Sequence, residues 1–302
     1  MSELPWLTHK AWATARYGHP VFRVPVDPGW SCPNRDAEGR GGCTFCAEDG
    51  GRARQLGEAA GAAQQVHRAV AFARERYAAK HLQLYLQAYT ATYADVESLK
   101  GLVEPLLDME PFHSLSLGTR PDCLSNGILE LLQDWNRRVE VWVELGVQTT
   151  HDATLRRIRR GHDWARSEAA VRRLEACGLR PAAHLIFGLP GESEAEMLES
   201  LERVCQTPVH GLKLHNLHVL RNSPLGGQWL AEPFEVMSDE GYLEFLANAL
   251  RRIPKHLPLF RVFTDSPPDQ RLAPPQTLKK GRFLHLLEKR MRERGWRQGD
   301  DV

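Results

Sequence analysis

Three of the six cysteines lie close together, in the segment Ser31–Cys46, which reads SCPNRDAEGRGGCTFC. Ten residues separate Cys32 from Cys43, and Cys43 and Cys46 form a CxxC pair. Almost every residue between Cys32 and Cys43 is polar, charged or glycine, so this segment is too polar to be buried core. Three thiolates suit a [4Fe–4S] cluster in which one iron has no protein ligand and remains open to a substrate or cofactor.

Two other interpretations of these thiols remain open. A structural zinc site needs four ligands, and Cys123, Cys177 and Cys205 each stand alone without a ligand-spaced companion. His67 lies too far along the chain to be an obvious fourth ligand. The same segment could also serve a non-catalytic protein, as a redox sensor or as an iron–sulfur or zinc module that recruits partners.

Composition sets broad limits on the class of protein. The chain has 302 residues, 42% of them hydrophobic and 25% charged, with a formal net charge of +1. It contains no membrane-length apolar run, and the first residues lack the apolar core of a signal peptide. We therefore expect a cytoplasmic protein with no membrane partner. A net charge of +1 neither requires nor excludes a nucleic-acid partner.

Extended and helical patterns alternate along most of the chain, which indicates β/α units around a parallel sheet. This alternation predicts an α/β fold with six β/α pairs in an open or closed barrel, followed by a C-terminal helical extension. Six strands are expected, at 21–27, 81–89, 113–119, 139–147, 180–189 and 211–220. The expected helices lie at 64–80, 94–108, 128–138, 151–161, 167–178 and 192–205.

Three segments follow from this pattern. Residues 1–63 form an N-terminal segment with the cysteines, 64–235 form the barrel core, and 236–302 form the extension. The extension begins with proline-rich sequence and continues as a basic amphipathic helix over 277–297. That helix is either a cap with a solvated charged face or a basic surface for phosphates.

Four further blocks accompany the cysteine segment, at 87–94 (QAYTATYA), 116–124 (SLGTRPDCL), 144–163 (ELGVQTTHDATLRRIRRGHD) and 184–192 (HLIFGLPGE). Together they resemble the YhcC/YtqA family of radical S-adenosylmethionine (radical SAM) proteins, in the branch that includes the Elp3-like proteins. The resemblance implies a partial (β/α)6 TIM-like barrel of the radical SAM type with a C-terminal helical extension. It also implies a [4Fe–4S] cluster on Cys32, Cys43 and Cys46, with SAM bound at the open iron. Reductive cleavage of SAM then gives a 5′-deoxyadenosyl radical, which requires an external low-potential electron donor.

The resemblance, together with the rule that parallel barrels carry their sites at the C-terminal ends of strands, gives candidate residues. The candidates for binding SAM are Phe45, Gln87, Tyr89, Glu144, Gln148, Arg160, His184, Gly188, Gly191 and Glu192. The candidates for binding substrate are Arg120, Asp122 and His215. An ion pair between Arg120 and Asp122 is the alternative to a substrate role, and Arg160 could instead be a solvated member of the run RRIRR.

The likeness to the Elp3-like proteins points to tRNA as the partner. The expected reaction converts 5-carboxymethylaminomethyluridine at the wobble position to 5-aminomethyluridine. The methylene between nitrogen and carboxylate is suited to radical chemistry, because both neighbours stabilise a radical there. A radical SAM enzyme acting on a small metabolite or a protein side chain is the alternative.

Overall fold

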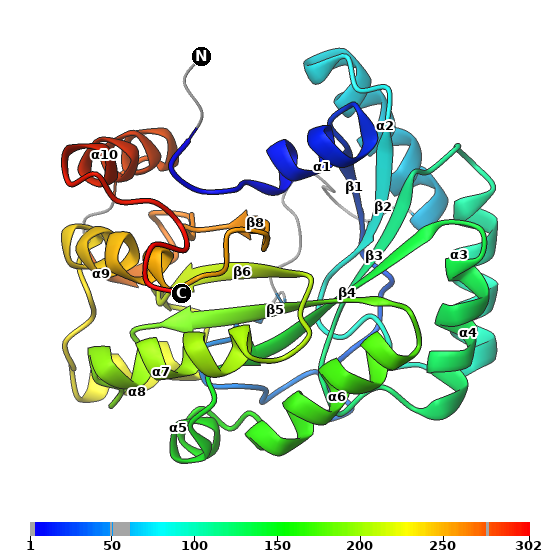
Figure 1. Ribbon diagram of the computed structural model, residues 1–302. Coiled ribbons are helices and arrows are strands. Elements are labelled where there is room, and N and C mark those ends of the chain that lie inside the picture. The colour runs from blue at the N-terminus through cyan, green and yellow to red at the C-terminus, as the bar shows by residue number, and fades with distance from the viewer. Residues whose placement is uncertain (1–3, 49, 51–60, 276–277) are drawn as a thin grey trace.

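One parallel sheet forms the centre of the protein, as a computed structural model shows for residues 4–48, 50, 61–275 and 278–302 (Figure 1). Its seven strands lie in the order β1-β2-β3-β4-β5-β6-β8. These strands are β1 (Phe22–Val26), β2 (Leu82–Leu86), β3 (Ser114–Thr119), β4 (Glu140–Gln148), β5 (Arg180–Phe187), β6 (Gly211–Asn216) and β8 (Leu259–Arg261). A separate antiparallel pair consists of β7 (Val219–Leu220) and β9 (Arg271–Ala273).

Several helices, among them α2, α3, α4, α6 and α7, cover the outer side of the curved sheet (Figure 1). All the helices of the described residues, in chain order, are α1 (His9–Tyr17), α2 (Ala62–Tyr77), α3 (Val96–Leu107), α4 (Asn126–Asn136), α5 (Asp152–Arg157), α6 (Trp164–Ala176), α7 (Glu194–Cys205), α8 (Pro224–Ala231), α9 (Asp239–Arg251) and α10 (Lys280–Glu293). The strands are buried on both faces and rich in Leu and Val, as expected of a parallel sheet.

Polar caps set where several helices begin after the strand ends. The side chains of Asp95, Ser125 and Asp163 accept backbone N–H groups at the starts of α3, α4 and α6. Ser193 and Glu196 form a reciprocal capping box at the start of α7. The chain therefore turns from strand to helix at one end of the sheet, and this is the end where the loops can build a site.

The prediction of a partial TIM-like barrel with a C-terminal helical extension is confirmed, with one more strand than expected. The added strand, β8, lies beside β6 and comes from the proline-rich part of the extension. Only three residues long, it is too short to show an alternation of polar and apolar residues. The sheet thus includes strands from all three predicted segments, since β1 belongs to the first and β8 to the last.

Gln298 joins the extension to the start of the chain. Its backbone N–H donates to the carbonyl of Pro5, and its side-chain oxygen accepts the N–H of Leu7 at 2.8 Å. Its side-chain amide donates to the carbonyls of Pro254 and Leu257 at 2.8 and 2.9 Å. The carbonyl of Leu7 in turn accepts the N–H of Leu259, so residues near both ends of the chain meet at the edge of β8.

Within the described ranges, every helix is too short or too polar to cross a bilayer.

Candidate functional site: a cysteine loop and the cavity beneath it

The segment Ser31–Cys46, called the cysteine loop below, is held in shape by backbone hydrogen bonds. The N–H of Arg35 donates to the carbonyl of Cys32 at 2.9 Å, and that of Cys46 donates to the carbonyl of Cys43 at 3.0 Å. The N–H of Thr44 donates to the carbonyl of Ile158, which fixes the loop beside the chain that follows β4. All three cysteines of the loop are free thiols.

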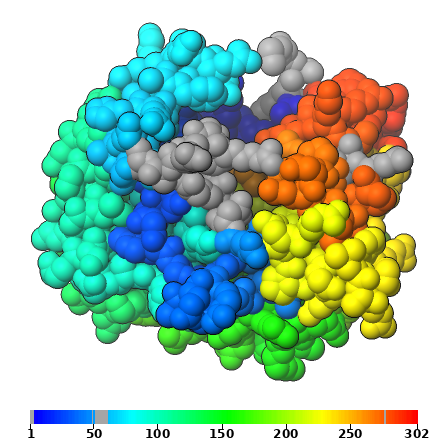
Figure 2. Space-filling view, turned by 180° about the vertical axis from the view of Figure 1, so that it is seen from behind, coloured from blue at the N-terminus to red at the C-terminus, as the bar shows by residue number. Residues whose placement is uncertain are grey.

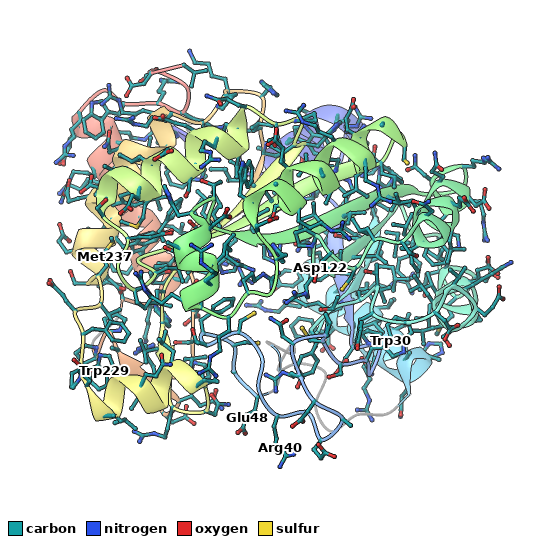
Figure 3. The ribbon with its side chains drawn as sticks, turned by 90° about the horizontal axis from the view of Figure 1, so that it is seen from below. Trp30, Arg40, Glu48, Asp122, Trp229 and Met237 are labelled. Carbon is teal, nitrogen blue, oxygen red and sulfur yellow. The ribbon has the colours of Figure 1, made fainter. Side chains whose placement is uncertain are left out.

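The cysteine loop and α8 occupy neighbouring parts of one face of the molecule (Figure 2). The N–H of Leu225 donates to the carbonyl of Thr44 at 2.7 Å, and that of Glu48 donates to the carbonyl of Asn222. Seen from below, Arg40 and Glu48 mark the outer end of this region, with Trp229 on α8 to one side and Asp122 further in (Figure 3). The loop is therefore braced against the α8 region as well as the barrel.

Each of the three thiols has a guanidinium group beside it. Nη1 of Arg160 lies 3.4 Å from Sγ of Cys43, and Nη2 of Arg35 lies 3.8 Å from Sγ of Cys46. Nη1 of Arg120 is 4.0 Å from Sγ of Cys32. The side-chain amide of Asn34 also donates to Sγ of Cys43, at 3.3 Å. Donors of this kind stabilise thiolates and other anionic groups.

The donor set fits an iron–sulfur cluster. Burial and the neighbouring Cys43 raise the pKa of Cys46 to about 11, which disfavours a bare thiolate, while Arg35 acts in the opposite direction. Binding to iron removes the proton outright, and the three guanidinium groups then offset the negative charge that the thiolates bring. Cys32, Cys43 and Cys46 would hold the cluster, with Arg35, Arg120 and Arg160 around it.

Arg160 is held by a bulge at the end of β4. Only 5% exposed, it donates from Nε and Nη2 to the carbonyl of Gly146, at 3.1 and 2.6 Å. The pairing of β4 with β5 shifts register between Gly146 and Gln148, and Gln148 has a φ of +74°. A Cβ on Gly146 would lie 2.6 Å from both Nη2 of Arg160 and Nε2 of Gln148. Glycine at 146 therefore permits both side chains to occupy these positions.

Beneath the loop lies a cavity of about 310 Å³, formed by the cysteines and the C-terminal ends of the strands. That volume is within the range of small-molecule sites. Nine predicted site residues other than the cysteines line it: Phe45, Gln87, Tyr89, Arg120, Glu144, Gln148, Arg160, His184 and His215. Residues from the ends of five neighbouring strands, β2 to β6, and from the cysteine loop thus meet in one space, which can hold a cofactor beside the thiols.

The other predicted residues lie outside the lining of this cavity. Asp122 makes a two-pronged ion pair with Arg120, at 2.9 and 2.8 Å, so Arg120 is already matched by a carboxylate. The N–H of Gly188 donates to the sulfur of Met197. A Cβ on Gly191 would collide with the guanidinium group of Arg157. Glu192 accepts the hydroxyl of Thr149, and burial raises the pKa of Glu192. A role for Asp122 in binding substrate, and for Gly188, Gly191 and Glu192 in binding SAM, stays a prediction.

Glu144 is the centre of a buried polar cluster at the floor of the cavity, called the floor cluster below. Its partners are Nη2 of Arg23 at 2.5 Å, Oγ of Ser116 at 2.9 Å, Nε2 of His184 at 2.8 Å, Nζ of Lys213 at 3.1 Å and the hydroxyl of Tyr85 at 3.3 Å. Glu144 is fully buried. Both carboxylate oxygens therefore accept hydrogen bonds from side chains of this protein. A role for Glu144 in binding SAM stays a prediction.

The charges of the floor cluster follow from burial and pairing. Burial alone would raise the pKa of Glu144, but Arg23 and Lys213 outweigh it and hold that pKa well below the usual range. Burial lowers the pKa of Lys213 to about 7, although Glu144 opposes the change. Burial and Lys213 lower the pKa of His184 to about 4, so its imidazole is neutral near pH 7. The floor thus presents the neutral imidazole of His184 to the cavity, with the charged groups paired behind it.

Sequence reasoning missed several residues of this site. Arg35 and Asn34 lie within the cysteine loop, and His218 lines the cavity after β6. The floor cluster had a usable signal: Arg23 and Lys213 are each a single cation in an otherwise apolar strand, and such a residue needs a buried partner. No comparable signal singles out Arg35, because a charged residue in a glycine-rich loop is ordinarily solvated.

Arg160→Gln is expected to make a cluster bound at this loop harder to reduce, because it removes a positive charge 3.4 Å from Sγ of Cys43. A loss of tenfold in the reduction equilibrium corresponds to about 59 mV for one electron. A redox titration followed by electron paramagnetic resonance measures the shift. Arg156→Gln is the matched control, since Arg156 belongs to the same run and is exposed. An unchanged potential in Arg160→Gln would contradict the prediction.

Comparison with known proteins agrees with this geometry. Residues 32–204 match the radical SAM superfamily model, and residues 209–293 match the radical SAM C-terminal domain. The chain belongs to the radical SAM superfamily, which implies an iron–sulfur cluster and SAM as cofactors. Within it the chain belongs with YhcC of Escherichia coli, to which it is 38% identical over 86% of this chain and 84% of that protein. YtqA of Bacillus subtilis is 34% identical over 94% of this chain and 88% of that protein.

More distant matches extend to a second group. A tRNA uridine(34) acetyltransferase of Methanocaldococcus infernus is 27% identical over 61% of this chain and 34% of that protein. The solved structure of Elp3 from the same organism superposes with a TM-score of 0.71 at 19% identity, covering 92% of this chain. This chain spans 64% of that structure. The superposition confirms the fold class, and the predicted kinship with the YhcC/YtqA and Elp3-like proteins is confirmed as well.

Proposed function

We propose that this radical SAM protein modifies tRNA, converting 5-carboxymethylaminomethyluridine at the wobble position to 5-aminomethyluridine. The observation that carries the proposal is that the three thiols and the strand ends enclose one cavity, in a chain related to proteins named for tRNA uridine(34) chemistry. When bound, the cluster and SAM together supply a 5′-deoxyadenosyl radical that removes a hydrogen atom from substrate.

The residues of this chain would position both molecules. The cysteine loop, with Arg35, Arg120 and Arg160 beside its thiols, would hold the cluster. Gln148 lies beside Arg160 at the end of β4. His184 and His215, 5.8 Å apart between ring centroids, line the same cavity as the three cysteines. Burial also lowers the pKa of His215 well below its usual range, so both rings are neutral and able to orient a polar substituent by hydrogen bonds.

The proposed reaction balances with SAM as the oxidant. Removal of a hydrogen atom from the methylene between nitrogen and carboxylate, followed by loss of an electron and a proton, gives an imine. Water adds to the imine, and the carbon–nitrogen bond breaks to give the aminomethyl nucleoside and glyoxylate. The substrate loses two electrons in total, and SAM accepts two as it becomes methionine and 5′-deoxyadenosine.

Mass spectrometry of tRNA nucleosides tests the proposal. The anaerobically reconstituted protein is incubated with SAM, a strong reductant and tRNA that carries the carboxymethylaminomethyl group. The expected result is conversion to the aminomethyl nucleoside, with glyoxylate and 5′-deoxyadenosine formed in equal amounts. Unmodified transcript of the same tRNA is the control and should give no glyoxylate. An unchanged nucleoside profile, with 5′-deoxyadenosine still produced, would reject tRNA and favour a small-molecule or protein substrate.

A further inference from the structure

Three histidines far apart in sequence meet at the opposite end of the sheet from the cysteine loop. His19 lies just before β1, His81 immediately precedes β2 and His113 immediately precedes β3. A nitrogen atom from each of the three rings lies within 4.8 Å of those of the other two. All three side chains are half-buried. The cavity lies at the C-terminal ends of these strands, so this cluster plays no part in the site described above.

Register in the sheet fixes the positions of these histidines. The carbonyl of His81 accepts the N–H of Phe22 at 2.9 Å, and the N–H of His113 donates to the carbonyl of Leu82 at 2.8 Å. These bonds continue the pairing of β1 with β2 and of β2 with β3. The pairing of the strands therefore holds the three histidines side by side even without any contact between their rings. Rotation of the side chains can then change the distances between the rings.

The rings offer nitrogen atoms that the protein does not use. Nδ1 of His19 is buried and has no hydrogen-bond partner among the described residues. A buried nitrogen without a partner is costly, and a metal ion is one group that would satisfy it. The rings of His19 and His81 are stacked with centroids 3.1 Å apart, closer than the usual separation of carbon atoms in contact. Spreading the rings around an ion would relieve that contact.

Among the described residues, this group offers only imidazole nitrogens to a metal ion. Tyr17 packs edge-on against His113 and covers one side of the cluster. No carboxylate of the described chain joins the three rings in the group, so the donor set is nitrogen alone. Nitrogen donors suit Zn²⁺, Co²⁺, Ni²⁺ and Cu²⁺, and they do not suit Mg²⁺ or Ca²⁺.

We propose that His19, His81 and His113 form a second metal site, which binds one divalent transition-metal ion such as Zn²⁺ and ties together the N-terminal ends of β1, β2 and β3. Zinc–nitrogen bonds are about 2.0–2.1 Å long, and side-chain rotation can bring the three nitrogens, which lie within 4.8 Å of one another, to that geometry. Three histidines leave a fourth coordination position for water. Because β1 is an edge strand of the sheet, the ion would secure the edge of the open barrel.

The test must separate this site from the cysteine loop, whose thiols also bind zinc and cobalt. Tag-free protein with its cluster reconstituted is therefore exposed to Co²⁺ or Zn²⁺, separated from unbound metal by gel filtration and analysed for metal. We expect one additional equivalent per chain. The cobalt spectrum should show ligand-field bands without thiolate-to-cobalt charge transfer. Saturating Zn²⁺ should also raise the melting temperature.

Variants and a direct measurement make the outcome decisive. His113→Gln and His81→Gln should lose the additional equivalent and the rise in melting temperature, whereas His256→Gln, at an exposed position, should keep both. X-ray absorption spectroscopy of the zinc-loaded wild type should show nitrogen neighbours only, a result that does not depend on how the variants fold. Absence of an additional equivalent, sulfur in the zinc shell, or full binding by His113→Gln would overturn the proposal.

Discussion

Cys43→Ala is expected to abolish 5′-deoxyadenosine formation by the reconstituted protein and to prevent cluster assembly. Cys43 is buried, 3% exposed, and is the thiol with the closest donors, Arg160 at 3.4 Å and Asn34 at 3.3 Å. Removing it leaves two thiolates, too few to hold the cluster, and leaves the buried guanidinium without its anionic neighbour. Iron and sulfide analysis, the visible absorption spectrum and chromatography of the SAM products measure the effect.

Cys177→Ala is the matched control for this experiment. Cys177 is also a free thiol, but it caps the end of α6 and does not line the cavity. Iron content and 5′-deoxyadenosine yield should match those of the wild type. Two results would contradict the assignment of the cysteine loop: cluster assembly by Cys43→Ala, or a wild-type protein that binds zinc and does not cleave SAM. The second result would favour the non-catalytic alternative.

Glu144→Gln should lower the free energy of unfolding by about 3–5 kcal/mol, the usual cost of removing one partner from a buried ion pair. Glu144 is fully buried, and both Arg23 and Lys213 depend on its charge. Unfolding in urea measures the loss. Adding Lys213→Met should recover part of it, because the second change removes a cation that the first has left unpaired. Equal stability of Glu144→Gln and the wild type would contradict the structure of the floor cluster.

The same cluster predicts how stability depends on pH. Because the folded pKa of Glu144 is depressed, the unfolded chain takes up its proton first as pH falls. The contribution of Glu144 is therefore present above its ordinary value of 4.5 and is lost progressively below it. For Lys213, with a folded pKa of about 7 against 10.5, the unfolded state binds more protons between those values. Its contribution to stability thus rises across that window, and Lys213→Met should remove the rise.

The fold was largely predictable because strands and helices carried strong local patterns. Six of the seven strands of the sheet were apolar runs between polar turns, whereas β8 has only three residues among prolines. Its place beside β6 depends on pairing with distant residues, among them the edge contact with Leu7. A local pattern cannot reveal a strand whose existence depends on partners so far away in sequence.

The candidate site was predictable in its cysteines and strand ends, and less so in its charges. Gln148 and Arg160 were found through motif likeness, and the structure adds the reason that they lie together, namely the bulge at Gly146. Arg35 was missed because it acts through a tertiary contact with Cys46. Lys213 carried a local signal, a cation in a buried strand, but that signal did not identify its partner Glu144. The group formed by His19, His81 and His113 was not predicted either, because only the register of the sheet brings these three residues together.

The four hydrogen bonds of Gln298 have a consequence for biosynthesis. Until residue 298 has been synthesised and has cleared the ribosome exit tunnel, the N–H of Leu7 and the carbonyls of Pro5, Pro254 and Leu257 lack these partners. Domains generally begin to fold from the N-terminus during synthesis. In this chain the N-terminal segment can pair with Leu259 of β8 earlier, but it gains the bonds to Gln298 that fix it there only afterwards. A nascent chain stalled before Gln298 would therefore lack these four bonds at the edge of the sheet.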